Sequence, residues 1–450
     1  MLKSNDNVKL ELGGSLSAAL HEREQRHMSP GLQEVAQLSR LAIREGRGCW
    51  LTDLDGRRYL DFMAGVAVCS LGHSHPRYIA ALQDQLSRVT VGSFTTENRA
   101  RLLALLASLT PPGLDRIQLY SGGAEAVEAA LRLAKSYTGK FEVLGFWGGF
   151  HGKTGGVLGL IGDPFKQHWG VLHPGLHLAP YADCYRCPFR MDYPGCGMYC
   201  LEFIRKVIAN NTAGSLAAII AETVQGTAGN IVPPPEFLPG LRQIANEHEA
   251  LLITDEMITG FGRTGLMFGC NHTGVRPDIM TIGKGMGNGF PVSGLVSSET
   301  ISSSLPFAKP SSSSSSYGGN PLAATAALAT VETILAEKLE ENSARVGAYL
   351  LAGLQRLQDS YEFIGAVRGQ GLMIGVELVK DRRTKEPIAK ALMQRIFLET
   401  LRRGMVSMNY KANFRINPPL VLTEAEADTG LAILNEVFNF VDRTLPWRQG

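Results

Sequence analysis

Short runs of consecutive apolar residues alternate with longer amphipathic segments through the middle of the chain. The apolar runs predict β-strands at residues 116–120, 141–146, 216–221, 250–254 and 278–282. The segments 124–137 and 236–248 carry apolar residues at helical spacing and predict α-helices between the strands. Strands that are apolar throughout are buried on both faces, which is typical of a mostly parallel sheet covered by helices. We therefore expect an α/β fold, in which ligands bind at the carboxyl ends of the strands.

The C-terminal part of the chain has a different pattern. Residues 322–340 predict a long alanine-rich helix, and residues 365–379 have the composition of a strand that contains glycines. Two further helices and a short strand are predicted, at 388–403, 423–440 and 414–416. This mixture predicts a smaller α+β domain. The serine run 311–316 predicts a loop that becomes ordered on binding, rather than a linker.

Composition limits the classes of protein to which the chain can belong. Of its 450 residues, 44% are hydrophobic and 19% are charged, which is typical of a globular protein with a large core. A formal net charge of +2 gives no basic excess, so we expect no nucleic acid partner. No apolar run reaches the roughly 18 residues that a membrane span needs. Because residues 1–20 also lack the apolar core of a signal peptide, we expect a cytoplasmic protein without a membrane partner.

Three of the predicted strands end in a charged residue. Glu222, Asp255 and Lys284 directly follow the apolar runs of their strands, and glycines surround Lys284. In a parallel sheet these three ends lie at one crevice. A lysine enclosed there loses its proton more easily and becomes a nucleophilic amine. The alternative is that each charge is a solvated turn residue, but three such ends favour a functional site.

These residue types suit a cofactor that is a phosphorylated pyridine aldehyde. Lys284 would bond the carbonyl, and a carboxylate such as Asp255 would keep the ring nitrogen protonated. The phosphate needs backbone N–H donors, and the glycine-rich turn 121–124 opens a predicted helix. Phe150 and His151 follow two glycines, so an aromatic face could lie on the pyridine ring.

With these motifs in view, the chain resembles the class III, pyridoxal phosphate-dependent aminotransferases of fold type I. The most specific motif is Asp-Glu-x-x-x-Gly-x-Gly-Arg-x-Gly at 255–265, followed by Lys284. Further matching stretches are 61–65, 71–76, 123–128, 150–154, 220–222, 317–321 and 414–416. The resemblance implies a large domain with a mostly parallel seven-stranded sheet at 66–325. It also implies an N-terminal arm that joins the small domain at 1–65, and a C-terminal small domain at 326–450.

The resemblance also implies roles for single residues. Lys284 and Asp255 would be catalytic, with Lys284 as the Schiff-base lysine that moves the substrate proton. The residues implied to bind pyridoxal phosphate are Gly123, Ala124, Phe150, His151, Glu222, Asp255, Met257, Ile258, Lys284 and Ser316. Ser316 would reach the phosphate of the neighbouring subunit, so the expected unit is a homodimer with shared active sites, with a tetramer left open. Glu222 could instead be purely structural.

Four residues are implied to contact the substrate: Val66, Lys153, Thr227 and Arg415. The planar guanidinium of Arg415 would bind a substrate carboxylate, unless it is an ordinary ion-pair residue. Relatives that act on γ-aminobutyrate or ornithine usually have an arginine where this chain has Lys153, and a glutamate that gates Arg415 where it has Thr227. We therefore do not expect an enzyme specific for γ-aminobutyrate or ornithine, although Lys153 could hold a distal carboxylate of the substrate.

The residues that the resemblance aligns also indicate whether the enzyme breaks the C–H bond of the substrate or removes its carboxylate. Stretches 111–116, 139–143 and 380–387 are similar to 2,2-dialkylglycine decarboxylase. That enzyme holds its labile carboxylate with a glutamine and a tryptophan, where this chain has Val66 and Phe150. We therefore expect an aminotransferase with pyruvate or 2-oxoglutarate as acceptor and ping-pong kinetics. Decarboxylating transamination, a phospho-lyase and a cofactor-binding regulator are the alternatives.

Four of the seven cysteines are close together in a proline-rich segment. Cys184, Cys187, Cys196 and Cys200 have a spacing close to that of a zinc site. We expect reduced thiols in a structural loop and no metal. A structural metal or a disulfide is left open.

Overall fold

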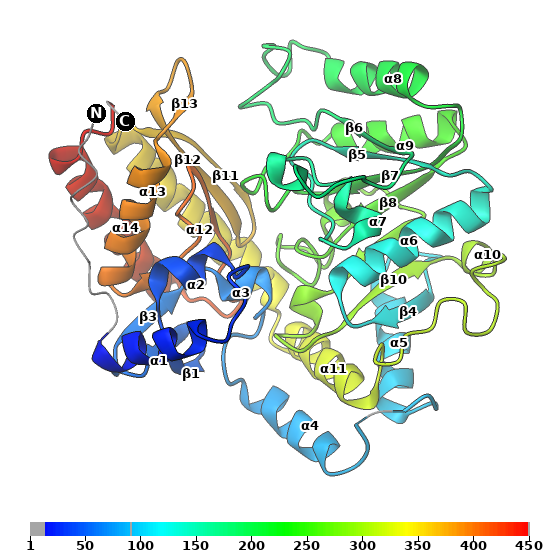
Figure 1. The fold of residues 1–450 in the computed structure, drawn as a ribbon, viewed down its shortest axis with the longest axis horizontal. Helices are drawn as coiled ribbons and strands as arrows, with labels where there is room; N and C mark the ends of the chain where they lie inside the picture. The colour runs from blue at the N-terminus through cyan, green and yellow to red at the C-terminus, as the bar shows by residue number, and fades with distance from the viewer. Residues whose placement is uncertain (1–13, 91, 449–450) are drawn as a thin grey trace.

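The computed structural model describes residues 14–90 and 92–448. A seven-stranded sheet forms one side of the molecule (Figure 1), in the order β4-β10-β9-β8-β7-β5-β6. Its strands are β4 (Arg116–Tyr120), β5 (Glu142–Phe146), β6 (Leu176–Ala179), β7 (Leu216–Glu222), β8 (Leu251–Asp255), β9 (Ile279–Ile282) and β10 (Ser293–Ser297). The five strands β9, β8, β7, β5 and β6 run parallel, and β10 is antiparallel to both β9 and β4. This confirms the predicted α/β fold with a mostly parallel sheet of seven strands.

Helices cover both faces of this sheet, because successive side chains of each strand point to opposite faces and are apolar on both. Ile220 of β7 packs under α6 (Gly123–Thr138), whereas Ile219 belongs to the core beneath α8 (Tyr199–Asn211) and α9 (Phe237–Glu247). Four short elements flank the sheet: α7 (Gly155–Leu158), α10 (Glu299–Ser302), η1 (Pro164–Lys166) and η2 (Gly269–His272). Continuous apolar strands are therefore the consequence of a sheet that faces helices on both sides.

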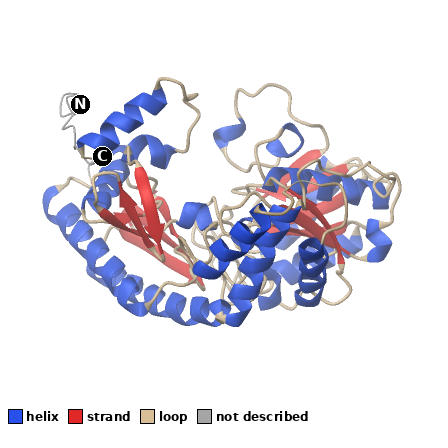
Figure 2. Ribbon diagram, turned by 90° about the horizontal axis from the view of Figure 1, so that it is seen from below, coloured by secondary structure: helices blue, strands red, loops and turns tan. Residues whose placement is uncertain are grey.

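The other side of the molecule combines residues from both ends of the chain. An antiparallel sheet contains β11 (Ile364–Gln370), β12 (Met373–Asp381), β13 (Glu386–Pro387) and β15 (Asn413–Ile416). Helix α12 (Leu339–Ser360) packs against β11 and β12, and α14 (Glu424–Thr444) packs against α12 and α13 (Lys390–Arg402). Figure 2 shows the strands of the molecule in two separate groups, each flanked by helices. A smaller sheet joins β1 (Ile43–Arg47), β2 (Trp50–Asp53) and β3 (Arg58–Asp61) to β14 (Met405–Val406).

Six further α-helices belong to the described structure. They are α1 (Ser15–Gln25), α2 (Glu34–Ser39), α3 (Ala64–Ala67), α4 (Pro76–Leu86), α5 (Glu97–Leu109) and α11 (Pro321–Ala336). Helix α11 packs against α4 and α5. No helix in the described part of the chain is long and apolar enough to cross a membrane. The domain limits at 65 and 325 remain predictions, and the second falls within α11.

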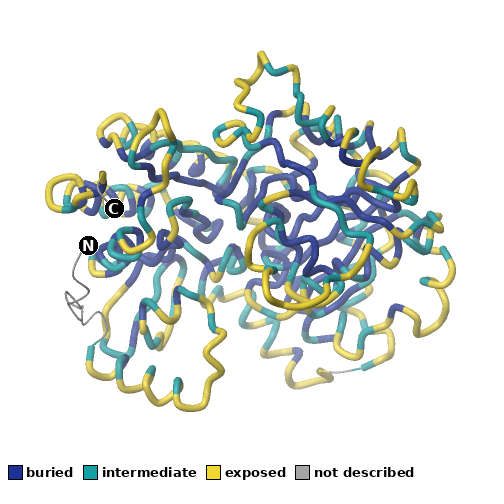
Figure 3. The backbone as a smooth tube through the Cα atoms, turned by 45° about the horizontal axis from the view of Figure 1, so that its top comes forward, coloured by how far each residue is buried: buried dark blue, intermediate teal, exposed yellow. Residues whose placement is uncertain are grey.

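The structure corrects two expectations for the C-terminal part. The helix predicted at 322–340 ends at Ala336, because Lys338 adopts a left-handed φ of 52° and is the N-cap of the next helix, α12. The strand predicted at 365–379 is a hairpin of β11 and β12 that turns at Gly371. There φ is +56°, and an added Cβ would stand 2.4 Å from the Thr264 carbonyl carbon, so glycine is required. The tube in Figure 3 shows buried backbone continuing through both sides of the molecule.

Candidate active site

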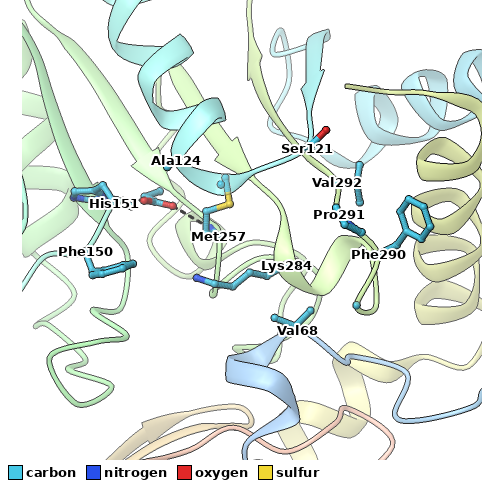
Figure 4. Close-up of a pocket in the computed structure, with 14 residues that line it drawn as sticks. Val68, Ser121, Ala124, Phe150, His151, Met257, Lys284, Phe290, Pro291 and Val292 are labelled. Atoms are coloured by element: carbon cyan, nitrogen blue, oxygen red, sulfur yellow. Dashed lines mark hydrogen bonds and ion pairs between the residues drawn. The ribbon is translucent and has the colours of Figure 1, made fainter. Parts of the chain in front are cut away.

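Lys284 lies where β9 ends and enters the 3₁₀ turn η3 (Lys284–Met286). Its side chain points into a cavity of about 360 Å³ at the carboxyl ends of the parallel strands (Figure 4). Gly283 permits this path, because a Cβ there would stand 2.7 Å from Met257 Sδ. Burial lowers the pKa of Lys284, although Asp255 and Glu222 act in the opposite direction. The amine is therefore more easily deprotonated than a surface lysine.

Asp255 ends β8 and lines the same cavity. Its Oδ2 lies 2.6 Å from His151 Nδ1, and its Oδ1 accepts hydrogen bonds from the Met257 amide at 3.1 Å and the Thr281 hydroxyl at 3.0 Å. Burial opposes its ionisation, but the bond to His151 and the nearby Lys284 keep the pKa of Asp255 below its ordinary value. A carboxylate has about four lone-pair positions, so one remains for a cationic partner.

The first turn of α6 forms another wall of the cavity. Gly122 is the N-cap, and Gly123 and Ala124 are the first helical residues. The Glu125 carboxylate accepts hydrogen bonds from the amides of Ser121 and Gly122 at 3.1 and 3.4 Å. The N–H groups of Gly123 and Ala124 have no carbonyl partner within the helix and can bind an anion.

Phe150 and Met257 come from opposite sides of the cavity, with the Lys284 amine near the space between them (Figure 4). Glu222 does not line the cavity but holds one of these walls. Its Oε1 accepts a hydrogen bond from the Phe150 amide at 3.0 Å, and its Oε2 accepts one from the Gly226 amide at 2.9 Å. Burial raises the pKa of Glu222.

Besides Glu222, six of the predicted site residues lie outside this cavity. Two are exposed: Ser316 in the serine-rich loop, and Lys153, whose Nζ is 4.9 Å from the centre of the Phe165 ring and 6.0 Å from that of Phe150. Ile258 is buried in a cluster with Ala67, Val224 and Met373. Val66 and Thr227 are half-buried, and Val66 packs against a cluster near the N-terminal sheet.

Arg415 is the sixth of these residues and lies on β15. It is half-buried, and burial lowers the pKa of its guanidinium, against the effects of Tyr410 and Glu222. Arg415 in turn lowers the pKa of Lys284, so the two cations influence each other electrostatically. Its guanidinium forms no ion pair among residues 14–90 and 92–448.

The sequence did not predict several residues of the cavity: Val68, Gly152 and the segment 289–292. It also missed Thr281 and the role of His151 as the partner of Asp255. The register of the sheet could have indicated Thr281, because it pairs with Asp255 across β8 and β9. The segment 289–292 continues the glycine-rich loop after Lys284, which was the available signal.

The cysteine-rich loop lies apart from this site. Cys184, Cys187, Cys196 and Cys200 line one small cavity, and all four thiols are free. Among the residues with described positions, no group of three or more His, Cys, Asp or Glu side chains is arranged to hold a metal ion.

The donors in the main cavity fit pyridoxal phosphate. An amine with a lowered pKa faces an anionic carboxylate and the open turn of a helix, with an aromatic ring and a thioether beside them. These groups match an aldehyde, a pyridinium nitrogen, a phosphate and a flat ring, respectively. Gly123 leaves room there, because an added Cβ would stand 3.3 Å from Met257 Sδ.

Comparison with known proteins agrees with this geometry. The profile of class III aminotransferases matches residues 33–438. A leucine/methionine racemase from Thermococcus litoralis is 36% identical over 387 residues, which cover 84% of this chain and 86% of the relative. A putrescine aminotransferase from Pectobacterium atrosepticum is 37% identical over 406 residues, covering 88% and 82%. The structure of an (S)-enantioselective omega-transaminase from Thermomicrobium roseum has a TM-score of 0.89 at 33% identity, covering 94% and 98%. The chain therefore belongs to the class III aminotransferases, enzymes of fold type I that transfer amino groups with pyridoxal phosphate.

Proposed function

We propose that the enzyme moves an amino group from an amine or amino acid to pyruvate or 2-oxoglutarate, in two half-reactions of a ping-pong cycle at Lys284. The observation that carries this proposal is the cavity itself. It brings the Lys284 amine, the Asp255 carboxylate and the N-terminus of α6 to one space. Each of these groups has a different task in the same reaction.

Bound pyridoxal phosphate supplies a carbonyl for the lysine and a ring that accepts the electron pair of a broken C–H bond. Lys284, whose pKa is lowered by burial, accepts the proton from the substrate α-carbon at Nζ and later returns it. Asp255, held as an anion by His151, keeps a proton on the ring nitrogen. The amides of Gly123 and Ala124 bind the phosphate.

The remaining residues near the cofactor orient it. Phe150 and Met257 enclose its ring, and the hydrogen bonds of Glu222 fix the backbone that carries Phe150. Ile258 packs against the same turn, because a Cβ on Gly226 would stand 2.4 Å from Ile258 Cδ1. We propose that Glu222 and Ile258 act through these contacts rather than by touching the reacting atoms.

We propose that Arg415 binds the substrate carboxylate in both half-reactions. Its guanidinium is free of ion pairs in the described structure, and Thr227 offers no carboxylate that could pair with it. Lys153 lies at the exposed side of Phe150 and would meet a second, distal carboxylate, as in 2-oxoglutarate. An amine donor without a carboxylate would leave Arg415 unused, so the panel of donors should include both kinds.

Proton transfer is favoured over loss of carbon dioxide. Val66 and Phe150 occupy the positions at which the dialkylglycine decarboxylases have polar side chains, and neither can donate a side-chain hydrogen bond to a labile carboxylate. Decarboxylation and elimination of phosphate therefore remain minor alternatives. The racemase among the relatives adds inversion at the α-carbon as a third outcome to be measured.

We also propose a cytoplasmic homodimer with shared active sites, possibly paired into a tetramer. Ser316 supports this assembly, because it is exposed in a loop whose neighbour Ser313 accepts a hydrogen bond at its carbonyl oxygen from the Tyr120 hydroxyl at 3.1 Å. A hydroxyl displayed in this way could complete the phosphate site of a second subunit. Sedimentation of the holoenzyme measures the assembly.

A screen of half-reactions tests the proposed function. Holoenzyme is mixed with single amines or amino acids, and the loss of cofactor absorbance at about 420 nm is recorded. Amino transfer predicts that the absorbance returns only when pyruvate or 2-oxoglutarate is added. Release of carbon dioxide or phosphate, or inversion of the donor without a keto acid, would assign one of the other reactions.

A further inference from the structure

A buried carboxylate joins the two sides of the molecule at some distance from Lys284. Glu377 lies on β12 and is 2% exposed. Its Oε1 forms an ion pair with Arg186, which belongs to the cysteine-rich loop between β6 and α8. Its Oε2 accepts a hydrogen bond from Arg368 Nη1 on β11 at 2.9 Å. One carboxylate therefore receives two arginines, one from each side.

The cysteine-rich loop fits closely onto the C-terminal sheet around this carboxylate. Arg186 Nη2 donates to the Lys385 carbonyl at 2.9 Å, and Lys385 Nζ donates back to the Tyr185 carbonyl at 2.7 Å. The Tyr185 hydroxyl lies against Gly365, where an added Cβ would stand 2.3 Å from it. These reciprocal bonds fix the orientation of the Arg186 side chain.

A second loop from the seven-stranded side meets the same strands. Arg368 Nη2 donates to the Gly229 carbonyl at 3.0 Å, and Asn413 Nδ2 donates to the Ala228 carbonyl at 2.5 Å. The approach is close, because a Cβ on Gly375 would stand 2.1 Å from the Gly229 oxygen. This loop follows Glu222, so it connects the strands of the C-terminal sheet to the wall of the active site.

The register of these strands connects the carboxylate to Arg415. In the antiparallel pair of β12 and β15, Glu377 faces Asn413 and Gly375 faces Arg415. Arg415 therefore lies two residues along β15 from Asn413, which pairs with Glu377 at the place where the cysteine-rich loop and the loop after Glu222 contact the C-terminal sheet. A shift of β12 relative to the seven-stranded side would move Arg415 relative to Lys284, since Lys284 belongs to that side.

We propose that Arg186 and Glu377 are positioning residues that place Arg415 for carboxylate substrates. The proposal rests on the proposed function in one respect, that Arg415 binds the substrate carboxylate. Neither residue touches the substrate. Their loss should weaken binding of carboxylates and leave the reaction of a plain amine largely unchanged.

The test compares Arg186→Gln and Glu377→Gln with Arg205→Gln. Arg205 pairs with Glu247 on the surface of α8 and α9, away from β12, and is a matched control. Each holoenzyme is assayed with L-alanine and with 1-phenylethylamine as donors. Because misplacement by about 1 Å can cost about a hundredfold, we expect KM for L-alanine to rise ten- to a hundredfold in Glu377→Gln. The rise should be smaller in Arg186→Gln, because Arg368 still holds the carboxylate.

Calorimetry with propanoate, which binds without reacting, provides a readout independent of turnover. Its dissociation constant should rise in both variants and stay within about twofold in Arg205→Gln. The single-turnover rate with 1-phenylethylamine should stay within about twofold in all three. Arg186→Gln, whose side chain is partly solvated, keeps the test usable if Glu377→Gln does not fold.

Two further results separate the proposals. If Arg415→Gln weakens propanoate binding and Glu377→Gln and Arg186→Gln do not, the positioning role is overturned and the role of Arg415 stands. If Arg415→Gln leaves propanoate binding unchanged, Arg415 does not bind the carboxylate, and both statements fail. Equal losses with L-alanine and 1-phenylethylamine in Glu377→Gln would indicate a merely structural residue and would also overturn the positioning role.

Discussion

His151 Nδ1 lies 2.6 Å from Asp255 Oδ2, and both side chains are almost completely enclosed. Burial disfavours charge on each group. The bond nevertheless raises the pKa of His151 and lowers that of Asp255 relative to their ordinary values. Each charged form therefore stabilises the other, which favours an anionic carboxylate beside the cofactor site even without solvent.

Removal of this partner should weaken catalysis without removing Asp255. In His151→Phe the carboxylate loses its strongest hydrogen bond, so its pKa should rise and the ring nitrogen of the cofactor should lose its counter-charge. We expect kcat to fall about ten- to a hundredfold, as for other residues that orient an essential ligand. His151→Asn, which can still donate a hydrogen bond, should retain most of the activity. Equal activity in His151→Phe and the wild type would contradict this role.

The same pair predicts how stability depends on pH. The folded-state pKa of His151 is raised above its ordinary value of 6.5. Its contribution to the unfolding free energy is therefore fully present below pH 6.5 and is lost as pH rises through the folded-state pKa. The unfolding free energy of the wild type should exceed that of His151→Phe by the largest amount below pH 6.5, and this difference should shrink at higher pH. Urea unfolding of both apoproteins at several pH values measures this difference. A difference that grew with pH would contradict a raised pKa of His151 in the folded protein.

Gly283 should tolerate no side chain. In Gly283→Ala the new Cβ would stand 2.7 Å from Met257 Sδ and 3.2 Å from Ser293 Cβ, so Met257 must shift toward the cofactor space. Overpacking of this kind costs about 1–3 kcal/mol of unfolding free energy, and we expect weaker cofactor binding as well. Gly31→Ala is the control, because an added Cβ there meets nothing within 4 Å. Both quantities can be measured by urea unfolding and by titration of the apoprotein with pyridoxal phosphate.

The cysteines should all titrate as thiols. We expect seven free thiols per chain in denaturant, since the described cysteines form no disulfide. In the folded protein Cys184 is exposed at the surface, but partial burial of its thiol, together with the neighbouring Cys196 and Cys200, raises its pKa to about 11. It should therefore react slowly with a disulfide reagent at neutral pH. Five thiols would reveal a disulfide. One equivalent of zinc in metal analysis would show that the loop binds metal.

Much of the large sheet could be predicted because its strands are apolar throughout. The runs that became β7, β8 and β9 were placed to within one or two residues, and their parallel order brings Glu222, Asp255 and Lys284 to one edge. Strand β10 was missed because its sequence contains two serines and a glycine, although all five residues are buried. Burial of this kind depends on neighbours that a local pattern does not contain.

The site itself was predicted in part. The residue types at the strand ends indicated a lysine and its carboxylate, but the bond between His151 and Asp255 depends on how the loop after β5 crosses β8. The exposed positions of Lys153 and Ser316 likewise depend on loop paths. The ion pair of Arg186 and Glu377 joins residues 191 positions apart, and no local spacing predicts such a contact.

Reduction of the holoenzyme with borohydride tests the central claim that Lys284 holds the cofactor. The treatment fixes the pyridoxyl group on the nitrogen that carries it, and peptide mass spectrometry then locates the modified residue. We predict that the group is found on Lys284 alone, and that Lys284→Ala shows neither the modification nor the absorbance near about 420 nm. A pyridoxyl group on another lysine of the wild type, or amino transfer by Lys284→Ala, would contradict the account.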